Sequence, residues 1–175
     1  MPETVSRRDV VKGIARGVPL AAVLADPVLA QAAASSLETV TITTAGGRIV
    51  SGALALPAGK PKAGILLIHE WWGLNDQIKA VAAEFANQGY LALAADLYEG
   101  KVATKPDDAR AYSRGTDPVA ATDTVKSWVE WLRKHKKNTG KVGTIGWCYG
   151  GGWSLNASLA ARVDATVIYY GRVNK

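Results

Sequence analysis

The stretch that decides the fold is Lys141-Val142-Gly143-Thr144-Ile145-Gly146-Trp147-Cys148-Tyr149-Gly150-Gly151. A short apolar run leads into the pattern Gly-x-Cys-x-Gly, which predicts a strand, a tight turn and a helix from about Gly151. Gly146 and Gly150 would leave room for Cys148 at the strained tip of the turn, and the positive end of the helix would favour its thiolate. The sequence therefore predicts a nucleophilic cysteine. The alternative is a buried structural cysteine in a glycine-rich turn.

Composition narrows the class of protein. The chain has 175 residues, 48% of them hydrophobic and 21% charged, as expected for one globular domain. The formal charge is +6, but the dense basic cluster at 133–141 falls where a helix should end, so we expect a solvated helix terminus and no nucleic-acid partner. One cysteine and two histidines exclude an intrachain disulfide and argue against a zinc site. We expect no metal and no cofactor.

The first 32 residues are typical of an export signal. Residues 6–12 read Ser-Arg-Arg-Asp-Val-Val-Lys, which is similar to a twin-arginine motif with valine in place of the usual phenylalanine. An interrupted apolar stretch follows, and Ala30-Gln31-Ala32 offers a cleavage site. We expect a signal peptide at 1–32, a domain at 33–175, periplasmic export and no stable membrane span after cleavage. The alternative is an amphipathic N-terminal helix.

The rest of the chain alternates between strand and helix patterns. Apolar runs predict strands at 63–68, 90–94, 141–146 and 165–170, and two earlier strand-like runs at 38–44 and 49–56 are joined by a glycine turn. Helices are expected at 75–87, 118–135 and 151–161, with a short helical piece at 107–113. This order predicts an α/β fold with a mostly parallel sheet flanked by helices, and leaves the apolar last strand at an edge.

Three motifs, in order, resemble those of the dienelactone hydrolase family, which has an α/β-hydrolase fold. They are His-Glu-Trp-Trp-Gly-Leu-Asn at 69–75, Ala-Asp-Leu-Tyr at 95–98 and Gly-Trp-Cys-Tyr-Gly-Gly at 146–151, with a weaker match in Tyr-Tyr-Gly at 169–171. The similarity covers about residues 38–171. It implies that Cys148 is the nucleophile of a Cys-His-Asp triad, that Glu70 holds the resting thiol, and that the substrates are small enol-lactones or related esters.

The chemistry of acyl transfer assigns further roles. Cys148 would form a thioester acyl-enzyme, and the oxyanion would accept hydrogen bonds from the backbone N–H groups of Tyr149 and Trp71. Glu70 would lie beside the thiol, although a strand-end carboxylate can also cap a helix or face solvent. Arg110 and Tyr112 lie on the segment where the family binds a substrate carboxylate. The alternative for these two residues is a surface helix.

The residues after Cys148 depart from the family pattern. In α/β-hydrolases the triad acid and histidine follow the nucleophile, whereas here only Asp164 follows, at the start of a strand, and no histidine does. His69 is expected to be structural and His135 solvated. We therefore expect the N-terminal two thirds of a hydrolase with its C-terminal part missing, by truncation or because a partner chain completes it. Two functions remain open: an exported cysteine hydrolase, impaired in this chain, or a non-catalytic remnant or binding module. The oligomeric state is not predicted.

Overall fold

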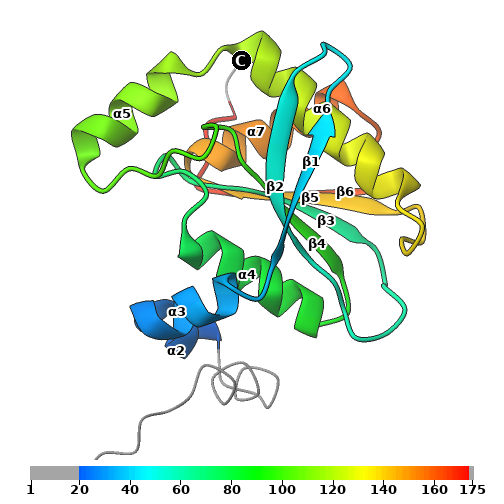
Figure 1. The fold of residues 1–175 in the computed structure, drawn as a ribbon. Helices are drawn as coiled ribbons and strands as arrows, with labels where there is room; N and C mark the ends of the chain where they lie inside the picture. The colour runs from blue at the N-terminus through cyan, green and yellow to red at the C-terminus, as the bar shows by residue number, and fades with distance from the viewer. Residues whose placement is uncertain (1–19, 174–175) are drawn as a thin grey trace, which may run out of the picture.

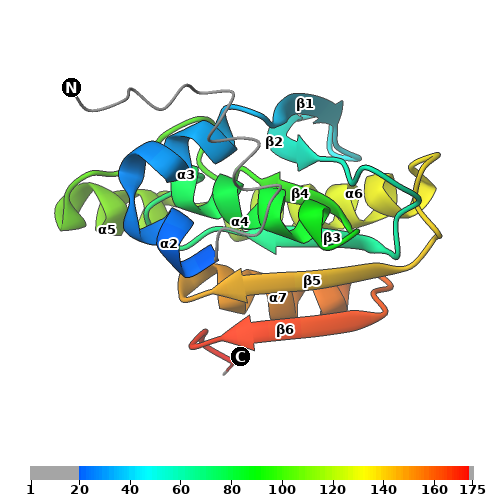
Figure 2. The same cartoon turned by 90° about the horizontal axis from the view of Figure 1, so that it is seen from below.

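The computed structural model describes residues 20–173, which fold into a six-stranded sheet with helices on both faces (Figures 1 and 2). The strands are β1 Glu38–Thr43, β2 Ile49–Ala55, β3 Gly64–Ile68, β4 Leu91–Ala95, β5 Val142–Trp147 and β6 Ala165–Tyr169. Their order across the sheet is β1-β2-β4-β3-β5-β6. The α/β fold predicted from the alternating pattern is confirmed.

The centre of the sheet is parallel. β3 pairs with β4 and β5, and β5 pairs with β6, all in parallel, whereas β1 and β2 form an antiparallel hairpin that joins β4. The continuous apolar runs explain this arrangement, because a strand covered on both faces needs apolar side chains on both. Leu66, Leu67 and Ile68 of β3 are fully buried. The four predicted parallel strands lie at the predicted positions, within one residue at each end.

Helices cover both faces of the sheet. They are α2 Leu20–Ala25, α3 Pro27–Ala34, α4 Asp76–Asn87, α5 Pro106–Gly115, α6 Pro118–Lys134 and α7 Tyr149–Ala160. In Figure 2, α4 lies on the near face with α2 and α3, and α6 and α7 lie behind the sheet. The Asn75 side chain caps α4 by accepting a hydrogen bond from Ile78 N, and Gly89 follows its end with φ 92°.

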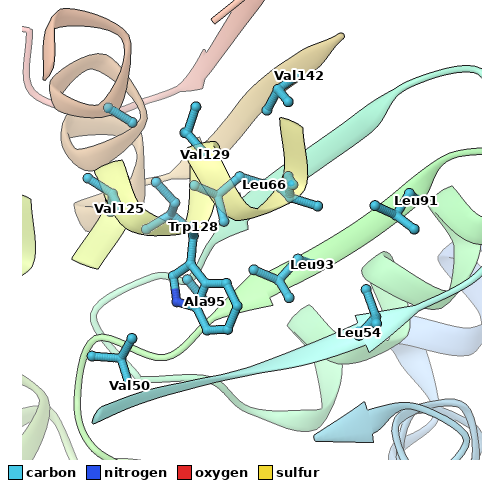
Figure 3. Packing of buried hydrophobic residues seen from close by; sticks show 13 residues of the cluster. Val50, Leu54, Leu66, Leu91, Leu93, Ala95, Val125, Trp128, Val129 and Val142 are labelled. Carbon is cyan, nitrogen blue, oxygen red and sulfur yellow. The ribbon is translucent and has the colours of Figure 1, made fainter. Parts of the chain in front are cut away.

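The core is divided by the sheet into two layers. On one face Trp128 of α6 packs among Val50, Leu93 and Val125 (Figure 3). On the other face Ile78 and the alanines of α4 pack against the opposite side chains of the same strands. The helix predicted for residues 118–135 is confirmed and is amphipathic, since its apolar residues Val125, Trp128, Val129 and Leu132 are at most 1% exposed.

Part of the expected export signal is folded in this structure. Val23 of α2 and Ala30 and Ala33 of α3 are buried against Ala80 of α4. The arginine pair at 7–8 lies outside the described residues, so the export prediction stays a prediction. No helix within residues 20–173 is long and apolar enough to cross a membrane.

The last strand lies at the edge of the sheet. Within the part of the chain that the structure describes, β6 has β5 on one side and no strand on the other. Val167 and Tyr169 of β6, and Tyr170 just after it, are all exposed. The prediction that residues 165–170 form an apolar edge strand is confirmed.

Candidate active site

The turn at Cys148 has the geometry of a strained strand-to-helix junction. Cys148 has φ 53° and ψ −116°, a conformation that side chains rarely adopt, and it directly precedes α7. Its N–H donates to the Tyr169 carbonyl at 2.9 Å, which ties the turn to β6. The helix begins at Tyr149, two residues before the predicted Gly151. The predicted start lies too far along the chain because glycine is a poor helix former. In the structure, Gly150 and Gly151 lie inside the first turn of α7.

Glycines at three positions make this turn possible. A Cβ on Gly146 would overlap the Gly150 carbonyl, and a Cβ on Gly150 would overlap the carbonyl oxygens of Ile68 and His69. Gly151 lies close to Gly171 in the same way. The backbone therefore approaches itself too closely for any other residue, as the pattern around Cys148 predicts.

Glu70 leaves the sheet beside Cys148. The parallel register pairs Ile68 of β3 with Gly146 of β5, and Glu70 and Cys148 each lie two residues further along. The Glu70 carboxylate accepts a hydrogen bond from Tyr170 Oη at 2.9 Å. Partial burial, this hydrogen bond and the charges of Glu70 and Cys148 raise the pKa of Tyr170 to about 12. Tyr170 therefore stays a neutral donor to Glu70 at physiological pH.

Two backbone N–H groups that follow β3 and β5 are candidates for an oxyanion hole. Within residues 20–173, no protein acceptor pairs with the N–H of Trp71 or of Tyr149. The loop that carries Trp71 is fixed: Gly73 N donates to Glu70 O at 3.3 Å, and Ala103 N donates to Trp72 O at 2.8 Å. Unpaired N–H groups on a rigid backbone are suited to stabilising an anion.

His69 is structural, as the sequence predicts. Its ring is fully buried and both nitrogens are occupied, because Leu97 N donates to Nε2 at 3.2 Å while Nδ1 lies 2.6 Å from the Glu70 carbonyl. With Nε2 accepting, Nδ1 carries the proton and donates. Burial lowers the pKa of His69, against smaller raising effects of this hydrogen bond and Asp96. A neutral imidazole with both nitrogens engaged cannot act as the base for Cys148.

His135 and Asp164 lie at the amino ends of the parallel strands, the end away from Cys148. His135 follows α6 and packs half-buried against Trp131, with ring centroids 4.8 Å apart, so the prediction that it is solvated is only partly correct. Asp164 accepts from Val142 N at 2.8 Å and pairs with Arg133 at 3.1 Å. Both groups lie near the start of β5, whereas Cys148 lies beyond its end.

Arg110 and Tyr112 lie on α5. Arg110 is half exposed and pairs with Asp107 of its own helix at 3.1 Å. Tyr112 packs against Tyr98, with ring centroids 5.8 Å apart, and lines a cleft of about 730 Å³ between the β1–β2 hairpin, α5 and α6. That cleft includes neither Cys148 nor Glu70 in its lining. The structure therefore does not bring Arg110 and Tyr112 into one pocket with the thiol.

A smaller groove of about 430 Å³ reaches Glu70. It lies between α4 and the ends of β5 and β6, and Trp147 and Tyr169 stack in it at 5.9 Å between ring centroids. Leu24 of α2 forms part of its wall. The groove offers an apolar surface with one carboxylate. No group of three or more potential metal ligands occurs within the described residues.

Sequence reasoning missed two residues at this site. Tyr170 belongs to the weakly matching Tyr-Tyr-Gly motif, but the sequence does not predict its role, because its contact with Glu70 spans 100 residues. Thr116 gave no signal at all, yet its hydroxyl accepts a hydrogen bond from Tyr149 Oη at 2.9 Å.

Comparisons with known proteins agree with this geometry. The sequence profile of the dienelactone hydrolase family matches residues 50–175. Protein usf of Aquifex pyrophilus is 38% identical over 136 residues, which are 70% of this chain and 56% of that protein. Carboxymethylenebutenolidase of Pseudomonas putida is 28% identical over 143 residues, 77% of this chain and 61% of the enzyme. The chain thus spans less than two thirds of the length of these relatives.

Solved structures give the same result. The structure named m3DLH superposes with a TM-score of 0.68 at 25% identity, over 79% of this chain and 61% of that one. A dienelactone hydrolase-like promiscuous phosphotriesterase from metagenomic libraries superposes with a TM-score of 0.66 at 24% identity, over 77% and 59% respectively, and supports the fold. From the family profile, the relatives and the shared fold we conclude that this chain belongs to the dienelactone hydrolase family.

Proposed function

We propose that this chain carries the attacking part of a hydrolase that cleaves small lactones or esters through a cysteine acyl-enzyme. The observation that carries the proposal is the strained turn at Cys148, with φ 53° and ψ −116°, at the N-terminus of α7. Strain of this kind costs about 1–3 kcal/mol and is concentrated at functional sites. The strand register, which brings Glu70 out of the sheet next to Cys148, supports the same conclusion.

The proposed reaction has two steps. The Cys148 thiolate attacks the substrate carbonyl carbon, and the oxyanion accepts hydrogen bonds from Trp71 N–H and Tyr149 N–H. Collapse of the tetrahedral intermediate breaks the carbon–oxygen bond, expels the alkoxide or enolate and leaves a thioester on Cys148. Water then hydrolyses the thioester. Glu70 is proposed to hold the resting thiol, and Arg110 and Tyr112 are proposed to bind a substrate carboxylate.

The second step is proposed to be slow in this chain. Deacylation needs a general base to activate water, and removal of a triad member typically costs on the order of 10⁴-fold or more in rate. His69 is buried with both nitrogens engaged, and His135 follows the far end of α6. The chain spans less than two thirds of the length of its relatives. We therefore propose the first step for this chain and ascribe the complete reaction to the longer relatives' type of protein only as part of the same proposal.

The experiment follows both steps with p-nitrophenyl acetate. We expect a burst of p-nitrophenolate equal to one equivalent of protein, followed by very slow turnover, and no burst in Cys148→Ala. Rapid steady turnover would show that an unassigned base is present. No burst and no modification of Cys148 would favour the alternative, a non-catalytic remnant or binding module.

We also propose that the protein is exported by the twin-arginine route. Support comes from the order of the charged, apolar and small-residue segments in residues 1–32. Since Ala30 and Ala32 are buried on α3, cleavage after Ala32 would require α3 to leave α4. Cell fractionation tests this: replacement of both Arg7 and Arg8 by lysine should retain the protein in the cytoplasm, and unchanged periplasmic delivery would contradict the proposal.

A further inference from the structure

Tyr149 has two separate connections to the site. Its backbone N–H directly follows Cys148 and has no protein acceptor among residues 20–173, and its side chain extends from the first residue of α7 into a cluster of aromatic rings. The ring centroid of Tyr149 lies 5.6 Å from that of Tyr98 and 6.1 Å from those of His69 and Trp153. Packing against several rings limits the tilt of the phenol. The hydrogen bond of the Tyr149 hydroxyl further restricts the position of the side chain.

The hydroxyl is held by a directed chain of hydrogen bonds. Tyr149 Oη lies 2.9 Å from Thr116 Oγ1, and Thr116 Oγ1 donates to the Tyr112 carbonyl at 3.0 Å. Because the Thr116 hydroxyl has one proton, and a carbonyl can only accept, Tyr149 must be the donor to Thr116. Burial raises the pKa of Tyr149, against smaller lowering effects of hydrogen bonds, so the phenol keeps this donor proton at physiological pH.

Thr116 is itself fixed in position. It is the C-cap residue directly after α5, and Asp117 immediately afterwards caps α6 by accepting a hydrogen bond from Val119 N at 2.9 Å. α6 is anchored in the core through the fully buried Trp128. The hydrogen bond between Thr116 and Tyr149 therefore ties the first residue of α7 to a rigid point 33 residues earlier in the sequence.

The turn needs such a connection. A strained conformation persists only where its surroundings hold it. The Cys148 side of the turn is held by the bond from Cys148 N to Tyr169 O, and the Cys148 carbonyl accepts from Gly151 N at 3.1 Å. The peptide between Cys148 and Tyr149 carries an N–H with no acceptor among residues 20–173, and the bond from Tyr149 Oη to Thr116 adds a further restraint on Tyr149.

We propose that Thr116 is a positioning residue for the oxyanion hole, acting through the Tyr149 hydroxyl to orient the Tyr149 N–H. This inference rests on the proposed function, since an oxyanion forms only if Cys148 attacks a carbonyl. Thr116 touches neither substrate nor thiol in this role. Its effect should therefore appear only in reactions that develop negative charge on oxygen.

Two reactions of the same thiol separate this role from simple packing. Attack on p-nitrophenyl acetate passes through an oxyanion before p-nitrophenolate leaves, whereas alkylation by iodoacetamide forms a carbon–sulfur bond as iodide departs, with no oxyanion. In Thr116→Val and Tyr149→Phe we expect the acylation rate to fall about tenfold, since a small misplacement of a fixed donor weakens transition-state binding. The alkylation rate should stay within about twofold, because thiol exposure and charge are unchanged.

Matched variants sharpen the test. Tyr149→Phe retains the bond from Thr116 to Tyr112 O, and Thr116→Ser retains the hydroxyl and should restore acylation. The double variant should be no slower than either single one, since both remove the same bond. Thr122→Val removes a comparable helix bond, from Oγ1 to Pro118 O at 2.7 Å, and should change neither rate.

Each result decides the question. Equal losses in acylation and alkylation would assign Thr116 to packing of the thiol and overturn the inference, as would wild-type acylation in both variants. If the wild-type protein is alkylated but never acylated, the proposed function fails, and the inference fails with it. If Thr116→Val does not fold, Tyr149→Phe alone carries the comparison.

Discussion

The two ends of the parallel strands are built in opposite ways. At the amino ends the polar groups are paired: Asp164 accepts from Val142 N and pairs with Arg133, and the Asn138 side chain donates to the carbonyls of Leu132 and Lys141. At the carboxyl ends Cys148 is strained and two N–H groups lack protein acceptors among the described residues. The amino ends stabilise the fold, whereas the carboxyl ends leave donors free for a ligand, as in other open α/β sheets.

Among the variants considered, Gly150→Ala should cause the largest loss of stability, because it changes the strained turn at the carboxyl ends. The added Cβ would overlap the backbone carbonyls of Ile68 and His69, and backbone cannot move aside as a side-chain end can. We expect a loss on the order of 3 kcal/mol or more in the free energy of unfolding. Urea denaturation measures it. Gly59→Ala, where no atom lies near the added Cβ, is the control, and equal stability of the two variants would contradict this account of the turn.

Cys148→Gly should raise the stability of the protein, whereas Gly150→Ala lowers it. Glycine tolerates φ 53° without the steric cost that cysteine bears, so the variant should be about 1 kcal/mol more stable while losing all reactivity with thiol reagents. A higher urea midpoint would show that the turn stores strain. A lower midpoint in Cys148→Gly would mean that the thiol packs well enough to outweigh that strain.

The smallest effect on stability is expected from a change of Asp164, at the amino ends of the parallel strands. The hydrogen bond from Val142 N, followed by Arg133, holds the pKa of Asp164 below its ordinary value of 3.8. A lowered carboxyl pKa contributes stability that is present above pH 3.8 and is lost as the pH falls through the folded-state value. Asp164→Asn should therefore flatten the acid limb of the stability curve.

Chemistry at the other end of the strands should be unaffected by Asp164→Asn. Thermal unfolding from neutral pH to about pH 2.5, paired with iodoacetamide labelling at pH 7, measures both properties. An unchanged acid limb would remove Asp164 from the account. A change in the labelling rate of Cys148 would show that the two ends are coupled.

Local pattern was sufficient to predict the strands and the turn. The apolar runs at 63–68 and 141–146 need burial on both faces, and the glycines around Cys148 allow only one kind of turn. The antiparallel pairing of β2 with β4 was not predicted, because the pairing of strands that are distant in sequence depends on which neighbours can be covered. The start of α7 was also missed, since tertiary contacts of Gly150 override its low helix propensity.

Long-range polar contacts could not be predicted from the sequence. Tyr170 meets Glu70 across 100 residues and Tyr149 meets Thr116 across 33, and the position of each hydroxyl is set by loops and helix ends. His69 was assigned correctly to structure, because alternate residues of an extended strand point to opposite sides. The exact bonds of its two nitrogens come only from the folded chain.

The proposed cysteine acyl-enzyme can be observed in the mass of the intact protein after a rapid quench with p-nitrophenyl acetate, followed by peptide mapping. We expect one acetyl group per chain, carried by Cys148 as a thioester that persists because deacylation is slow. An acetyl group that never accumulates while ester is consumed, or one that is found on lysines and is equally present in Cys148→Ala, would contradict this proposal.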